Sequence, residues 1–217
     1  ELNASDVVYT FKRIYSENLV AELNEWSLNG KYHFRIKNRG MAYIMDQLSL
    51  SDQDKILFLD TDTYFNKSPL PLFDLIQSNQ ALFYLNEGLI YERKRFQVYI
   101  DYLEGRKIEI DGDFYELSMK SAMWGSLMVG IMPNMRPSLD WADKLMQVFI
   151  EIVPAHTIEP FSLAESLKKK YKITEGKKYT VSEGTIEELY ADADEKEEGN
   201  FYKSLNDVHD KLKKING

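Results

Sequence analysis

The chain contains no cysteine and no long apolar run, and each absence excludes a class of protein. Without cysteine there can be no disulfide, no thiol chemistry and no cysteine-ligated zinc site. A membrane-spanning helix needs roughly 18 or more apolar residues in succession. The longest apolar stretch, residues 127–132, is interrupted by Gly130 and stopped by Pro133. We therefore expect no transmembrane segment.

Positive charge is also scarce, because 27 lysine and arginine residues face 35 acidic ones and leave a net charge of -8. A general DNA or RNA binder would show a basic face, so we expect no nucleic-acid partner. A locally basic cleft can still bind a small anion on an acidic protein. We expect a cytoplasmic protein, with peripheral membrane contact left open by the lysines at 168–170, 177 and 178.

Helical and strand patterns alternate along the chain, which predicts an α/β fold. A hydrophobic content of 44% over 217 residues is enough for one core, so we expect a single domain over residues 1–217. Strands are predicted at 6–11, 55–59, 81–85 and 127–131. Helices are predicted between the cap Ser16 and Gly30, and at 41–48, 72–77, 139–153 and 159–170. Residues 183–199 are predicted to be an acidic loop and 200–216 an amphipathic helix.

Two aspartates follow the most apolar of these strands, in the sequence DKILFLDTDTYF over residues 54–65. If the extended geometry continues, Asp60 and Asp62 leave the backbone on the same face. Ligands bind at the carboxyl ends of strands in open α/β sheets. Paired carboxylates there suit Mg²⁺ or Mn²⁺, whose remaining positions substrate phosphates commonly fill. From the residues alone, a metal site and an ordinary turn or pair of caps both remain open.

Three segments of the chain resemble, in order, the motifs of GT-A glycosyltransferases. The block at 54–65, with YHFRIK at 32–37 before it and PLPLFDLI at 69–76 after it, resembles the donor site of the family. MWGSLMVGI at 123–131 resembles the acceptor-side segment, and IEPFSLA at 158–164 resembles a later element that carries an acidic residue and glutamine. The nearest likeness is to glycogenin-like retaining enzymes and related bacterial proteins of polysaccharide biosynthesis.

The resemblance implies a GT-A fold, with a Rossmann-like, mostly parallel central sheet flanked by helices. It also implies transfer of a sugar from a nucleotide-diphosphate sugar, with UDP as the expected nucleotide, to a carbohydrate or glycolipid acceptor. Mn²⁺ or Mg²⁺ would be bound by the Asp60-Thr61-Asp62 motif and would neutralise the diphosphate leaving group. Arg35 and Lys37 would add positive charge on the donor side, unless they are exposed cations at a helix start.

On the acceptor side, the same likeness places Trp124, Gly125 and Ser126 in the sugar pocket and turns Glu159 toward the acceptor or the transferred sugar. Trp124 as an ordinary core aromatic remains open. A retaining transferase needs no obvious catalytic base, and we name none.

The chain departs from the family pattern at four places. Gly125 stands where the family has a side chain that bonds the sugar, and Pro160 replaces the expected glutamine. The stretch at 189–191 lacks the histidine that serves as third metal ligand. The first strand of the family is absent or replaced by residues 6–11. These departures keep open a degenerate GT-A domain that binds a nucleotide sugar or a partner without turnover.

A phosphatase of the haloacid-dehalogenase type is a further alternative, because it also begins with a strand and an Asp-x-Asp pair. Asp60 would then be the nucleophile and Asp62 the acid and base. Tyr64 occupies a place that this motif gives to threonine or valine, and more than fifty residues precede the pair. Both features favour the glycosyltransferase interpretation.

Overall fold

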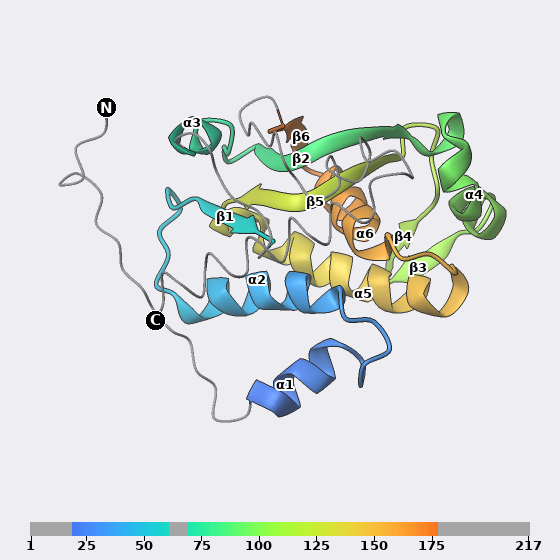
Figure 1. Cartoon of the computed structure of the whole chain (residues 1–217), viewed down its shortest axis with the longest axis horizontal. Coiled ribbons are helices and arrows are strands. Elements are labelled where there is room, and N and C mark those ends of the chain that lie inside the picture. The colour runs from blue at the N-terminus through green and yellow to red at the C-terminus, as the bar shows by residue number, and fades with distance from the viewer. Residues whose placement is uncertain (1–18, 61–68, 178–217) are drawn as a thin grey trace, which may run out of the picture.

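The computed structural model describes residues 19–60 and 69–177, and the structural statements below concern these residues (Figure 1). The helices are α1 (Leu19–Trp26), α2 (Arg35–Gln47), α3 (Leu70–Phe73), α4 (Gln97–Leu103), α5 (Arg136–Ile152) and α6 (Ile158–Leu167). The strands are β1 (Ile56–Leu59), β2 (Gln80–Leu89), β3 (Ile108–Ile110), β4 (Asp113–Tyr115), β5 (Ala122–Ile131) and β6 (Lys172–Glu175). No helix in this part of the chain is long and apolar enough to cross a membrane.

The central sheet has four strands in the order β1-β5-β2-β6, and β3 and β4 form a separate hairpin. Strand β5 pairs antiparallel with both β1 and β2, whereas β6 pairs parallel with β2. Strands β1, β2 and β6 therefore run in one direction and β5 in the other. The fold is mixed α/β as predicted, but the expectation of a mostly parallel sheet is wrong for the described strands. A short apolar strand buried on both faces has the same sequence pattern whichever way its neighbours run.

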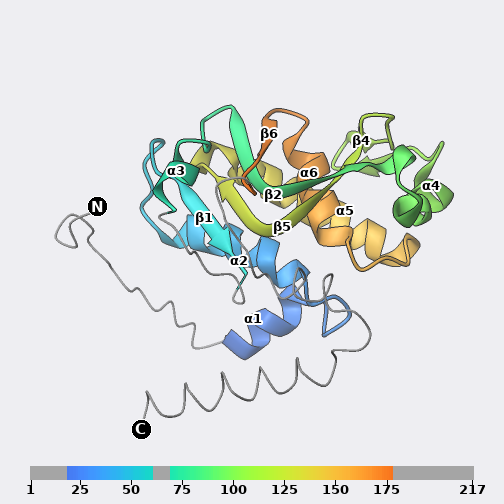
Figure 2. The same ribbon diagram turned by 45° about the horizontal axis from the view of Figure 1, so that its top comes forward.

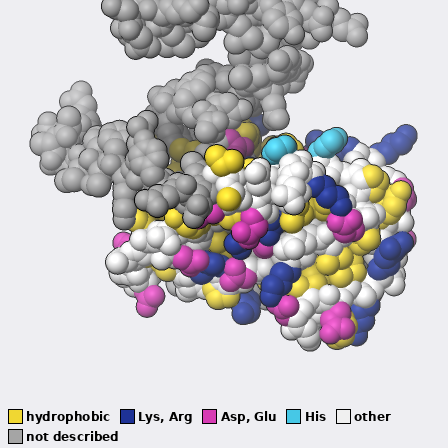
Figure 3. Space-filling model, turned by 90° about the horizontal axis from the view of Figure 1, so that it is seen from below, with side chains coloured by type: hydrophobic (Ala, Val, Ile, Leu, Met, Phe, Trp, Pro, Cys, Tyr) yellow, Lys and Arg dark blue, Asp and Glu magenta, His cyan; other side chains and the backbone are white. Residues whose placement is uncertain are grey.

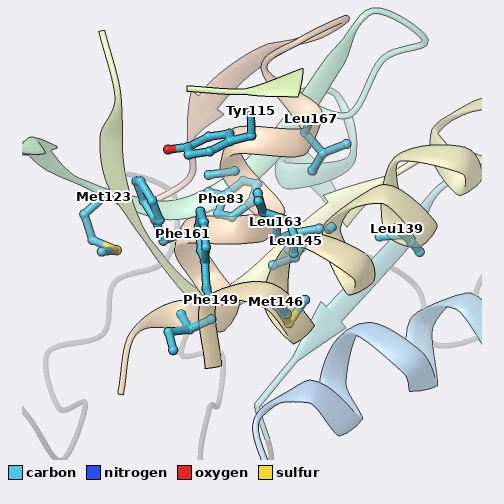
Figure 4. Close-up of a cluster of buried hydrophobic side chains, with 14 of the residues drawn as sticks. Phe83, Tyr115, Met123, Leu139, Leu145, Met146, Phe149, Phe161, Leu163 and Leu167 are labelled. Carbon is cyan, nitrogen blue, oxygen red and sulfur yellow. The ribbon is translucent and has the colours of Figure 1, made fainter. Parts of the chain in front are cut away.

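Helices cover both faces of this sheet, as Figures 1 and 2 show. Helices α2, α5 and α6 bury the larger cluster against residues such as Phe83 and Val129, and Figure 4 shows Phe83, Phe149 and Phe161 within it. On the opposite face, Leu72 of α3 packs with Leu82 and Met128 in a smaller cluster. Because side chains alternate across a strand, neighbouring residues of β2 and β5 supply the two clusters.

The predicted strands at 55–59, 81–85 and 127–131 correspond to β1, β2 and β5, but β2 and β5 each extend over ten residues. The additional residues include Asn86 and Glu87 in β2 and residues 124–126 in β5. They interrupt the apolar pattern, so the sequence did not predict the full length of either strand. The predicted strand at 6–11, the acidic loop at 183–199 and the helix at 200–216 lie outside the described residues.

Helix α2 begins at Arg35, six residues before the predicted start at Met41. The face that packs on α5 starts with Arg35 and Asn38, which are buried but polar, so the helical spacing of apolar residues does not show there. The surface carries charges of both signs, and on the face shown in Figure 3 acidic and basic side chains are interspersed.

Candidate functional site

Three residues from separate segments, Asp60, Ser126 and Glu159, meet around the ammonium group of Lys37. The Lys37 Nζ lies 3.0 Å from a carboxylate oxygen of Asp60 and donates to both the carbonyl and the hydroxyl oxygen of Ser126, each at 3.0 Å. The Ser126 hydroxyl donates to Glu159 Oε2 at 2.8 Å, and the same carboxylate oxygen lies 3.7 Å from Lys37 Nζ. The structure thus brings together four of the residues that the sequence motifs singled out. We call this set the Lys37 network.

Each member is placed by the element that carries it. Asp60 follows β1 directly, and its backbone N–H bonds the carbonyl of Leu127 at 2.9 Å, which continues the pairing with β5 and sets Asp60 beside Ser126. Lys37 extends from the first turn of α2, and its ammonium lies 5.3 Å above the ring of Phe58. Glu159 is the second residue of α6. The network therefore forms where the carboxyl end of β1 meets the amino-terminal ends of α2 and α6.

Tyr32 connects the segment before α2 to the start of α6, and sequence analysis did not assign it a role. Its hydroxyl accepts the backbone N–H of Glu159 at 2.9 Å and donates to the carbonyl of His156 at 2.7 Å. One of the otherwise unbonded N–H groups in the first turn of α6 is thereby satisfied. Pro160 lies in the same turn, where the missing N–H of proline has no intrahelical partner to lose. The departure from glutamine at Pro160 therefore leaves the helix undisturbed.

Glu159 is the most deeply buried charged member of the network, with 1% of its surface exposed. Burial raises the pKa of the Glu159 carboxyl to about 7, while the Lys37 ammonium and the Ser126 hydroxyl oppose this shift and Asp60 adds to it. Its second oxygen, Oε1, has no hydrogen-bond partner among the described residues. Because an unsatisfied buried acceptor is costly, this oxygen is suited to accept a hydrogen bond from a bound hydroxyl.

The raised pKa of Glu159 predicts a pH-dependent stability. Between about pH 4.5 and 7 the folded state holds a proton that the unfolded state has released, so the free energy of unfolding should fall as the pH rises through this window. In Glu159→Gln this fall should be smaller. Urea denaturation of both proteins near pH 5 and near pH 8 measures the difference. Equal pH dependence in the two proteins would contradict the raised pKa.

The structure does not bring Arg35 into the network. Its guanidinium forms two hydrogen bonds to the Asp143 carboxylate, at 2.6 and 2.8 Å, and also donates to the carbonyls of Glu25 and Trp26. Arg35 is 5% exposed and the side chain of Lys37 is 11% exposed, so the interpretation of both as exposed cations is wrong. Arg35 instead fixes the start of α2 against α5, and this holds Lys37 in place.

The remaining predicted residues fall into two groups. Trp124 is partly buried, packs against the main core and lies with its ring 6.0 Å from that of Phe83, in agreement with the core interpretation. Gly125 pairs with Leu85 of β2, next to Ser126. Thr61 and Asp62 lie outside the described residues, as does the stretch at 189–191.

Asp60 has features that suit a ligand of a divalent cation. It offers hard carboxylate oxygens, its side chain is 29% exposed, and it stands at the end of a strand. Within residues 19–60 and 69–177 there is no group of three or more histidine and acidic side chains that could hold a metal ion. A metal at this site would therefore need further ligands from residues outside the described ones, such as Asp62, or from a bound molecule.

No protein-family model, no curated protein and no solved structure matches the chain.

Proposed function

We propose that the chain is a GT-A-like glycosyltransferase domain that moves a sugar from a nucleotide-diphosphate sugar, with UDP as the nucleotide, to a carbohydrate or glycolipid acceptor. The observation that carries the proposal is the convergence of Lys37, Asp60, Ser126 and Glu159 on one point. These residues come from the three segments whose sequences resemble the donor and acceptor motifs of that family. Chance similarity of short motifs gives no reason for their side chains to meet.

The direction of the strands also supports this proposal. Strands β1 and β2 run the same way; the carboxyl end of β1 lies beside Met128 in the middle of β5, and that of β2 lies beside Ala122 at the start of β5. Asp60 follows the carboxyl end of β1, and Ser126 lies beside it. In open α/β sheets the carboxyl ends of strands are the usual place for a nucleotide, because the loops that follow the strands converge there.

Each residue of the network can bind a different part of the nucleotide sugar or of the acceptor. Lys37 donates to the Asp60 carboxylate and to Ser126, and would exchange its bond to Asp60 for oxygens of the diphosphate. A Mn²⁺ or Mg²⁺ ion on Asp60 and Asp62 would supply charge neutralisation for the departing diphosphate. Glu159 offers its Oε1 to a hydroxyl of the sugar or the acceptor. Ser126 bonds both Lys37 and Glu159 and so keeps the two groups at a fixed separation.

Release of UDP from UDP-sugars in the presence of Mn²⁺ tests the proposed activity. We expect slow release from at least one UDP-hexose with water as acceptor, and a loss of about a hundredfold or more in Asp60→Asn, because that carboxylate acts on the leaving group. Asp52→Asn, an exposed aspartate in the loop before β1, removes the same charge and should leave the rate unchanged.

Other outcomes of this experiment separate the alternative functions. UDP binding without release from any sugar nucleotide would indicate a degenerate domain. The ion pair between Lys37 and Asp60 favours the degenerate domain, because Lys37 already pairs with the carboxylate that would bind the metal. Phosphate release from a generic phosphate monoester would instead indicate a phosphatase with Asp60 as nucleophile.

A further inference from the structure

A cavity of about 240 Å³ lies between α1, α2 and the start of α5. Helix α1 runs beside α2, as both ribbon views show (Figures 1 and 2). The α2 residues of this cavity, among them Arg39, Tyr43 and Asp46, lie on the flank opposite Lys37, since 3.6 residues make one helical turn. Drug-sized ligands commonly occupy pockets of about 300–1,000 Å³. The cavity is therefore separate from the Lys37 network and suits a smaller molecule.

Two opposite charges face this cavity without forming an ion pair with each other. Arg39 Nε is buried and has no hydrogen-bond partner in the described part of the chain. Arg39 Nη1 comes only within 4.0 Å of an Asp143 oxygen that already accepts two hydrogen bonds. Glu22 Oε2 is likewise buried and without a partner among residues 19–60 and 69–177. Unpaired polar atoms of charged groups are costly to bury, so a ligand that bonds both would be stabilised here.

The other charges around the cavity do not add positive charge to it. Arg136 forms two hydrogen bonds to the Asp46 carboxylate, at 2.9 and 2.7 Å, and also pairs with Asp140. The lining includes three carboxylates and two guanidinium groups. This balance disfavours a plain anion such as phosphate, whereas a plain cation would leave Arg39 unpaired. A molecule that carries both charges satisfies Glu22 and Arg39 together.

Two aromatic rings form much of the apolar wall of the cavity. The ring centroids of Trp26 and Tyr43 lie 5.4 Å apart, with the rings inclined at 54°. Trp26 is 8% exposed, and its carbonyl accepts a hydrogen bond from Arg35, which ties the end of α1 to α2. A wall that is already fixed lowers the entropic cost of binding. An apolar side chain of a ligand would pack against these rings.

We propose that this cavity binds a small zwitterion, an α-amino acid with an apolar side chain. The carboxylate of the ligand accepts hydrogen bonds from the guanidinium of Arg39, whose planar fork matches a carboxylate. The ammonium group donates to Glu22 Oε2, and the side chain lies against Trp26 and Tyr43. This site is independent of the proposed function, because none of its residues belongs to the Lys37 network.

Calorimetric titration of the full chain with L-leucine and L-phenylalanine tests the proposal, together with analogues that each lack one charge. For leucine these are 4-methylpentanoate and 3-methylbutylamine, and for phenylalanine 3-phenylpropanoate and 2-phenylethylamine. We expect at least one of the amino acids to bind, and both of its analogues to bind about tenfold or more weakly, since each loses a charge-assisted hydrogen bond. D-glucose and inorganic phosphate represent a neutral polar ligand and a plain anion.

Three results in wild type would overturn the proposal. These are no binding of either amino acid, an analogue that binds as tightly as its parent, and tighter binding of glucose or phosphate than of both amino acids. The comparison needs no substitution, so it remains decisive if a variant does not fold.

Two variants identify the contacts within the cavity. Arg39→Met should weaken binding of the amino acid about tenfold or more and leave the affinity for the amine analogue unchanged. Glu22→Gln should weaken binding of the amino acid and of the amine but not of the carboxylate analogue. Equal loss for all ligands in a variant would indicate a merely structural effect and would overturn that contact. Arg106→Met and Glu92→Gln remove exposed charges and are the controls with no expected effect.

Discussion

Replacing Arg35 with methionine should lower the free energy of unfolding by about 3–5 kcal/mol, the largest effect on stability that we expect at any charged residue. The substitution leaves the Asp143 carboxylate buried, with 5% of the residue exposed and both hydrogen bonds from Arg35 removed. The carbonyls of Glu25 and Trp26 also lose a donor. Asp143 keeps the amide of Gln147 at 3.0 Å and a guanidinium nitrogen of Arg39 at 4.0 Å, but a buried carboxylate that loses its main partner costs more than the ion pair itself contributes.

Urea denaturation near neutral pH measures this effect, with Arg106→Met as a control for the loss of one exposed arginine. The double variant Arg35→Met with Asp143→Leu should recover much of the lost stability, because no unpaired charge remains. A loss below about 1 kcal/mol in the single variant would show that Arg35 is dispensable for docking α2 on α5. The proposed placement of Lys37 by Arg35 would then have no support.

Replacing Lys37 with methionine should weaken UDP binding by about tenfold to a hundredfold, which corresponds to the binding free energy of one or two charge-assisted hydrogen bonds. The ammonium is buried between Asp60, Ser126 and Glu159 and is well placed to bind an anionic oxygen. Its loss should also raise the pKa of Glu159 further, because Lys37 is the main group that opposes the effect of burial on that carboxyl.

Calorimetric titration with UDP measures the first effect, and Lys55→Met is the matched control. Lys55 lies just before β1, carries the same charge and bonds only the carbonyl of Phe73 in the described structure. Thermal unfolding of both variants checks that the fold persists. Undiminished UDP affinity in Lys37→Met would place the diphosphate away from the network.

The sequence predicted the elements whose apolar residues carry the signal. Strand β1 and helix α5 were placed within a few residues, since their apolar positions match a buried strand and a helix of regular spacing. The antiparallel direction of β5 was not predictable, because strand direction depends on the long connection through α4 and the β3–β4 hairpin. Strand β6 was missed because KITE is short and three of its four residues are polar.

The sequence also singled out some residues of the candidate site, through short motifs and not through the spacing of apolar residues. Their positions after strands and within motifs pointed to Lys37, Asp60, Ser126 and Glu159. The hydrogen bonds that connect these four residues are visible only in the three-dimensional structure. Arg35 lies in the same motif and serves packing instead. A sequence pattern does not distinguish a buried arginine from a ligand-binding one, because the difference lies in the partner, Asp143, which is 108 residues away.

Titration of the protein with UDP, with and without Mn²⁺, in wild type and in Asp60→Asn tests the central claim most directly. If the Lys37 network is the donor site of a metal-dependent glycosyltransferase, Mn²⁺ should tighten UDP binding to wild type by about tenfold or more, and the variant should lose this gain. Asp62→Asn should behave in the same way. Binding of UDP that is equally tight with and without Mn²⁺, or equal in wild type and Asp60→Asn, would contradict the account.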